Sequence, residues 1–277
     1  MNALKILLYI VLFIALFSLF NFWLNTHPPK YRSRETPESY GIEYEKIKFK
    51  TADGYTLAGW LVLGKKNAPT IIIGHGYPFD KGNILPVALF LYPDYNLFFF
   101  DFRSFGESEG NITTGGAREI EDFNAAVRYL KTRKDINQIF GAYGFSLSAF
   151  TFIAANNPDI RAIVADSGYA SIHDIISRMY SYLGPFKAPF VWMTELYGRI
   201  FLGIDSKKYV AHVTVPTLLI HGGKDSQIPP QQSQKIYATN KEMAEIWIIP
   251  GIDHGMSYAA NPKEYKQRVR EFFKKHL

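Results

Sequence analysis

The sequence predicts an α/β fold with a doubly wound, mostly parallel, eight-stranded sheet. Strand-like and helix-like runs alternate from Tyr44 onwards, and most strand-like runs are apolar without alternation. Such runs are typical of strands buried on both faces, because helices cover both sides of a parallel sheet. A third observation, a turn signal ending in Asp53-Gly54, predicts an antiparallel hairpin at the start of the sheet.

The strands and helices can be placed in order along the chain. The hairpin strands are expected at residues 44–50 and 55–63. The remaining strands are expected at residues 70–73, 97–100, 139–143, 162–165, 217–220 and 246–249. Helices are expected at residues 83–91, 117–132, 147–156, 230–239 and 258–275. Residues 44–277 are therefore expected to form one α/β domain.

A long apolar segment precedes this domain. Residues 6–24 carry no charge, and only Ser18 and Asn21 among them are clearly polar. At about 1.5 Å per residue, such a helix spans roughly 28 Å, which is close to the hydrocarbon thickness of a bilayer. We therefore expect residues 1–26 to be an uncleaved, single transmembrane anchor. A cleaved signal peptide, which would need a small-residue cleavage site, and a hydrophobic helix packed on the domain are the alternatives.

Residues 27–43 are rich in proline and basic residues, which predicts an extended spacer that holds the body away from the membrane. Lys30, Arg32 and Arg34 follow the apolar segment, whereas Lys5 precedes it. By a small margin, the positive-inside rule favours a cytoplasmic body.

Residues 167–211 interrupt the alternation of strands and helices. This stretch contains nine aromatic residues and only three acidic ones. We expect a helical lid or cap insertion here. The alternative is an additional helix pair that fills ordinary core, because aromatic residues are common in cores.

Composition excludes several classes of protein. The chain of 277 residues has no cysteine, which excludes disulfides, cysteine-ligated metals and a cysteine nucleophile. Four of its six net positive charges lie in residues 263–277, so the charge does not indicate a nucleic-acid interface. Metal-ligand spacings and nucleotide-binding glycine motifs are also missing from the sequence, so we expect no metal and no cofactor. The oligomeric state is left open.

A candidate nucleophile follows the predicted strand at residues 139–143. Gly144-Phe145-Ser146-Leu147-Ser148 lies between this strand and a helix, which is the context of a nucleophile elbow with Ser146 at its apex. Small residues beside the serine let the strand and the helix approach closely, and Gly144 supplies one of them. Ser148 is a poorer candidate, because Phe150 would then occupy a small-residue position.

A serine nucleophile needs an imidazole to take its proton and a carboxylate to orient that imidazole. Asp225 and His254 follow the strands at residues 217–220 and 246–249. The carboxyl ends of parallel strands meet at one edge of a sheet, so we expect these side chains to converge with Ser146. Asp253 is the alternative orienting carboxylate.

With these residues, the sequence resembles the α/β-hydrolase superfamily over residues 44–277. More narrowly, it looks like the serine hydrolases that include monoacylglycerol lipase-like, serine aminopeptidase-like and acyl-protein thioesterase-like members. The resemblance implies that His75-Gly76-Tyr77 is the oxyanion segment and that the amides of Tyr77 and Leu147 bind the oxyanion. In this interpretation His75, Gly76 and Gly144 support the site, and residues 101–108 form a structural loop beside it.

The predicted activity is that of a membrane-anchored serine hydrolase. Ser146, Asp225 and His254 would cleave an acyl ester or thioester through an acyl-enzyme. The expected partners are a small-molecule or lipid-like acyl substrate and, through residues 6–24, a membrane. The alternatives are a serine aminopeptidase or acylaminoacyl peptidase with the same triad, and a non-catalytic, membrane-tethered binding protein.

Overall fold

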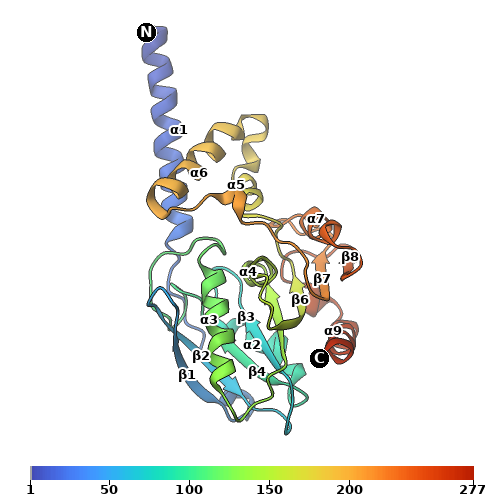
Figure 1. The fold of residues 1–277 in the computed structure, drawn as a ribbon. Helices are drawn as coiled ribbons and strands as arrows, with labels where there is room; N and C mark the ends of the chain where they lie inside the picture. Colours follow the sequence, from blue (N-terminus) through green and yellow to red (C-terminus); the bar gives the residue numbers. More distant parts are fainter. Residues whose placement is uncertain (1) are drawn as a thin grey trace.

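One mixed sheet forms the centre of the computed structural model, which describes residues 2–277 (Figure 1). Its strand order is β1-β2-β4-β3-β5-β6-β7-β8. The strands are β1 (Glu45–Lys50), β2 (Thr56–Val62), β3 (Thr70–Gly74), β4 (Asn96–Phe100), β5 (Phe140–Phe145), β6 (Ile160–Asp166), β7 (Thr217–Gly222) and β8 (Ala244–Ile249). Only β2 runs against its neighbours, β1 and β4; all other adjacent pairs are parallel. The predicted eight-stranded, mostly parallel sheet with a hairpin is confirmed.

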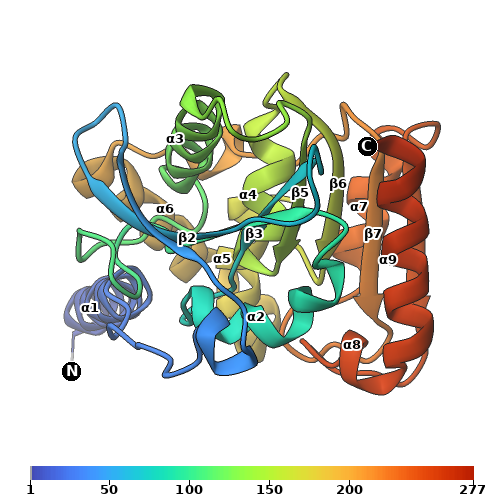
Figure 2. The same ribbon diagram turned by 90° about the horizontal axis from the view of Figure 1, so that it is seen from below.

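Helices cover both faces of the sheet (Figure 2). One face packs against α3 (Glu119–Thr132), α4 (Leu147–Ala155) and α7 (Gln231–Thr239). The other packs against α2 (Lys81–Ala88), the short 3₁₀ helix η2 (Leu89–Leu91) and α9 (Pro262–His276). Burial on both faces explains why strands such as β3 and β4 have every residue buried and show no polar alternation.

The last predicted helix is divided in two. We expected one helix over residues 258–275, but the structure has α8 (Ser257–Ala260) and α9, which begins at Pro262. Proline is suited to the first helical position because it has no amide hydrogen to donate. The Asn261 side chain caps α9 by accepting from the Glu264 amide at 3.2 Å.

Helix α1 (Ala3–Thr26) is the one described helix that is long and apolar enough to span a membrane; Met1 of the predicted anchor lies outside the described residues. Its first half extends beyond the body, and residues such as Leu8 (64% exposed) and Phe13 (60% exposed) face outwards (Figure 1). Its second half packs against α6 (Ala188–Leu202). The Tyr197 hydroxyl, for example, donates to the Ala15 carbonyl at 2.9 Å.

The segment after α1 lies against the body. It includes the 3₁₀ helix η1 (Pro37–Tyr40). The Lys30 ammonium donates to the Ser108 carbonyl at 2.9 Å, and the Ser33 amide donates to Asp80 at 2.7 Å. Residues 27–43 were expected to act as an extended spacer, whereas these contacts fix the segment to the domain. Proline and basic residues allowed an extended chain but did not exclude hydrogen bonds to the surface.

The insertion between β6 and β7 is helical. It comprises α5 (Ile172–Met179), η3 (Ser181–Lys187), α6 and η4 (Ser206–Lys208). In Figure 1, α5 and α6 lie beyond the end of the sheet, with α6 beside α1. Whether the insertion acts as a lid stays a prediction.

Candidate active site

Ser146 lies at a sharp turn between β5 and α4. Its φ of 56° and ψ of −106° are rare for a residue with a side chain, so the backbone is strained at this position. The Ser146 amide donates to the Asp166 carbonyl at 2.8 Å, which fixes the turn to the end of β6. These are the strand, turn and helix expected around Ser146.

Close packing around this turn requires glycine. A Cβ atom on Gly144 would lie 2.7 Å from backbone atoms of Ser148 and Ala149, which cannot easily move. A Cβ atom on Gly76 would lie 2.8 Å from the Phe145 ring and 3.3 Å from the Ser146 Cβ. The His75-Gly76 segment and the serine turn are therefore in direct contact.

His254 and Asp225 meet beside Ser146. The His254 Nδ1 donates to Asp225 Oδ2 at 2.7 Å, which leaves Nε2 free to accept a proton. The other carboxylate oxygen of Asp225 accepts from the amides of Gln227 at 3.0 Å and Ile228 at 2.7 Å. Burial opposes ionisation of Asp225, but hydrogen bonds from His221, His254 and Ile228 outweigh it and hold the pKa of the carboxyl below its ordinary value.

The role of His221 was missed from sequence. Its Nε2 lies 3.2 Å from Asp225 Oδ2. The same nitrogen donates to the Ile228 carbonyl at 2.8 Å, and Nδ1 bonds to the Ser233 hydroxyl at 2.7 Å. His221 therefore helps to position the carboxylate. A histidine at a strand end four residues before the aspartate was the available signal.

The two rival residues are engaged elsewhere. Asp253 accepts from the amide and hydroxyl of Ser226, at 2.8 and 2.9 Å, and from the His254 backbone amide at 2.7 Å. The Ser148 hydroxyl accepts from the Phe145 amide at 2.7 Å and donates to its carbonyl at 3.0 Å. The structure thus brings Asp225, not Asp253, to the imidazole.

His75, in the segment that the sequence predicts to bind the oxyanion, is fully buried. Its Nδ1 donates to the Gly76 carbonyl at 2.9 Å, and its Nε2 accepts from the Phe102 amide at 3.2 Å. Burial lowers the pKa of His75, which favours the neutral form of the ring. Within residues 2–277, the backbone amides of Tyr77 and Leu147 have no hydrogen-bond acceptor. Both residues line the cavity that contains Ser146.

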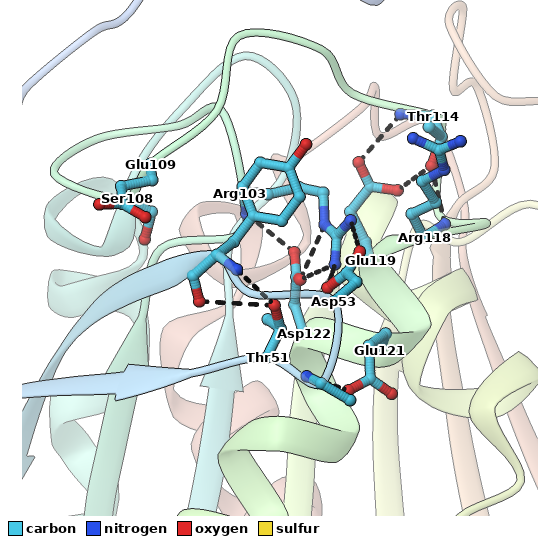
Figure 3. Close-up of polar contacts among 12 residues, drawn as sticks. Thr51, Asp53, Arg103, Ser108, Glu109, Thr114, Arg118, Glu119, Glu121 and Asp122 are labelled. Carbon is cyan, nitrogen blue, oxygen red and sulfur yellow. Dashed lines mark hydrogen bonds and ion pairs between the residues drawn. The ribbon is translucent and has the colours of Figure 1, made fainter. Parts of the chain in front are cut away.

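The loop beside the site is held by a buried arginine (Figure 3). The Arg103 guanidinium lies 2.7 Å from buried Asp122 and 2.7 Å from Asp53, and the Tyr55 ring stacks on it at 4.7 Å. Arg103 also donates its backbone amide to Asp122 at 2.8 Å. These contacts join the 101–108 loop to α3 and to the turn between β1 and β2. None of these residues lines the cavity, so the loop is structural.

A cavity of about 310 Å³ opens beside Ser146 and His254. Most of its wall is apolar and comes from α5, α6 and the loops after β6 and β7. The apolar wall residues are Phe22, Leu147, Tyr169, Ile172, Ile175, Ile176, Met179, Leu202, Ile204 and Ile228.

No hydrogen bond joins Ser146 to His254 in residues 2–277. In enzymes without bound substrate, catalytic hydrogen bonds are often long and shorten only when substrate binds.

One acidic side chain also lines this cavity. Glu195 of α6 accepts from His173 Nδ1 at 2.7 Å and from the Ser206 hydroxyl at 2.6 Å, both at its Oε1. The second oxygen of Glu195 has no hydrogen-bond donor within the described chain. Three separate segments build this cluster, so no local sequence pattern marks it.

The described residues contain no group of three or more histidine or acidic side chains that could hold a metal ion.

The sequence matches a family model and several curated proteins. Residues 64–197 match the model of the X-Pro dipeptidyl-peptidase (S15) family. The uncharacterised protein YfhR of Escherichia coli O157:H7 is 30% identical over 223 residues, covering 76% of this chain and 73% of the relative. A thiohydrolase of Aspergillus aculeatus, aneE, is 34% identical over 117 residues, covering 40% of this chain and 37% of the relative.

Solved structures extend the comparison to the whole fold. The esterase Pf2001 of Pyrococcus furiosus is 28% identical and superimposes with a TM-score of 0.75, covering 91% of this chain and 98% of the esterase. A doubly wound sheet with a serine at the turn after β5 is the architecture of α/β hydrolases. The chain belongs to the α/β-hydrolase superfamily and is a hydrolase of that type. Within the superfamily it is related to YfhR and similar in structure to Pf2001.

Proposed function

We propose that this protein is a serine hydrolase that cleaves esters or thioesters of apolar acyl groups. The observation that carries the proposal is one cavity that contains Ser146, His254 and a mostly apolar wall, with Asp225 held on the far side of the imidazole. The similarity to an esterase and to a thiohydrolase supports the type of bond.

The proposed reaction has two acyl-transfer steps. Ser146 Oγ attacks the carbonyl carbon while its proton passes to His254 Nε2, and the amides of Tyr77 and Leu147 donate to the oxyanion that forms. Collapse of this intermediate breaks the bond to the alcohol or thiol, which leaves with the proton from His254. His254 then takes a proton from water, and the resulting hydroxide attacks the acyl-enzyme. Collapse of this second intermediate breaks the bond to Ser146 Oγ, which takes the proton from His254 as the carboxylic acid is released.

A second candidate function is hydrolysis of aminoacyl substrates. The Glu195 carboxylate lies in the cavity wall with one oxygen unengaged in the described chain, and a carboxylate there could pair with a substrate ammonium group. The match to a dipeptidyl-peptidase family favours the same alternative.

Turnover of p-nitrophenyl octanoate and of an aminoacyl-p-nitroanilide by the full-length protein in detergent tests these two functions. We expect ester turnover to dominate and Glu195→Gln to change it little. If the anilide is the better substrate and Glu195→Gln abolishes its hydrolysis, the peptidase function is the correct one.

We further propose that α1 anchors the protein in a membrane. Its 24 residues would span about 36 Å at 1.5 Å per residue. The insertion, whose helix α6 packs against α1, carries further exposed apolar side chains, among them Phe186 and Trp192. The greater positive charge after α1 favours a cytoplasmic catalytic domain. Membrane fractionation and protease protection of the full-length protein test attachment and side, respectively; a soluble protein lacking α1 would indicate a cleaved signal peptide.

A further inference from the structure

The end of α1 forms part of the cavity wall. Phe22, Asn25 and Thr26 line the cavity that contains Ser146 and His254. The segment expected to serve only as an anchor thus reaches the candidate active site, although it is more than 100 positions away in the sequence.

Several contacts hold α1 in this position. The Phe22 ring packs against Tyr197 and Phe201 of α6, each with a centroid distance of 6.1 Å. The carbonyl of Thr26 accepts from the Thr113 amide at 2.8 Å, and Thr113 lines the same cavity. The end of α1 is therefore joined both to the insertion and to the loop before α3.

Opposite sides of this helix meet different surroundings. Phe22 is half-buried and lines the cavity, whereas Phe20, two positions earlier, is 60% exposed and does not line it. Positions two residues apart on a helix lie about 200° apart around its axis, so their side chains point to nearly opposite sides. The helix can therefore contact lipid through Phe20 while Phe22 contacts whatever occupies the cavity.

We propose that the last two turns of α1 are a substrate-binding element that sets the length of the acyl chain. This inference rests on the proposed ester hydrolysis. The cavity volume of about 310 Å³ is at the small end of the range for ligand sites, which favours a single acyl chain over a diacyl lipid. The substrate class is accordingly a membrane-associated ester or thioester with one acyl chain, bound beside Phe22.

Chain-length profiles of three variants test this role. Full-length wild type, Phe22→Ala, Phe22→Trp and the matched control Phe20→Ala are compared in the same detergent with p-nitrophenyl butyrate, octanoate and dodecanoate. Phe22→Ala enlarges the cavity and should raise the ratio of kcat/KM for dodecanoate over butyrate. Phe22→Trp narrows the cavity and should lower this ratio. The change expected in each direction is about tenfold, the scale on which hydrophobic pockets discriminate chain length. Phe20→Ala should keep the wild-type ratio.

The results of this experiment distinguish a failure of the inference about α1 from a failure of the proposed ester hydrolysis. If wild type shows Ser146-dependent turnover but both Phe22 variants keep its ratio, α1 does not set chain length and the inference is wrong. A shift in the same direction in both variants would also contradict it, because general loosening of α1 would have that effect. If turnover does not depend on Ser146, the proposed function itself fails.

Discussion

The His254 imidazole donates to a carboxylate, Asp225, whose side chain is entirely buried; the Nδ1–Oδ2 distance is 2.7 Å. Two backbone amides and His221 also contact this carboxylate. The hydrogen bond favours the tautomer of the imidazole that has its proton on Nδ1, and Nε2 is then the nitrogen that can accept a proton. Orientation and tautomer are the two properties that a serine–histidine pair needs from its third member.

Replacing Asp225 by asparagine should remove this control. We expect Asp225→Asn to lower kcat for an ester by roughly 10⁴-fold, because the asparagine amide favours the wrong tautomer. The matched control is Asp253→Asn, which removes the neighbouring carboxylate that bonds to Ser226. Steady-state kinetics should show little change in this control; an equal loss in both variants would mean that Asp225 is not the orienting group.

The buried, neutral His75 should make stability depend on pH. Its pKa is lowered in the folded protein, so below pH about 6.5 the unfolded chain binds a proton that the native state does not. The contribution of His75 to the free energy of unfolding is therefore fully present above that pH and is lost as the pH falls below it.

Denaturant unfolding of wild type and His75→Gln between neutral and mildly acidic pH measures this effect. The free energy of unfolding of wild type, relative to the variant, should fall by up to about 1.4 kcal/mol per pH unit below the histidine pKa of the unfolded chain. A difference that stays constant with pH would show that His75 titrates alike in both states.

Gly76 should be intolerant of any side chain. A Cβ atom there would meet the Phe145 ring at 2.8 Å, and relief of this contact would move the oxyanion segment away from Ser146. We expect Gly76→Ala to lower kcat by about 10²-fold, the loss typical of one oxyanion donor, with KM little changed. Unaltered kcat in a folded variant would contradict the assignment of the Tyr77 amide.

Arg103 should matter for stability and not for chemistry. Arg103→Met leaves Asp122 buried without its partner, which should lower the free energy of unfolding by about 3–5 kcal/mol. The exposed Arg128, which pairs with Glu121, is the matched control, and Arg128→Met should cost less than about 1 kcal/mol. If denaturant unfolding shows that both variants lose the same free energy of unfolding, burial does not determine how much an ion pair contributes to the stability of this protein.

Local patterns predicted the sheet and the positions of Ser146, Asp225 and His254. Apolar runs mark buried strands, and in a parallel sheet the residues that follow them must lie at one edge. This rule predicted which side chains would be neighbours without any knowledge of the strand order.

The contacts of α1 and of Glu195 could not be predicted in this way. Residues 6–24 are apolar on every side of the helix, so no stripe marks the face that packs on α6. Glu195, His173 and Ser206 come together only because the insertion folds back on itself. Sequence patterns describe single elements, whereas these contacts depend on how separate elements pack.

Covalent labelling of Ser146 tests the central claim most directly. The full-length protein in detergent is treated with a fluorophosphonate, which reacts with activated serines, and the modified peptide is identified by mass spectrometry. We predict modification of Ser146 and loss of labelling in Ser146→Ala, with labelling retained in the neighbouring Ser148→Ala variant. Labelling that persists in Ser146→Ala, or that maps to another serine, would contradict the assignment of Ser146 as the nucleophile.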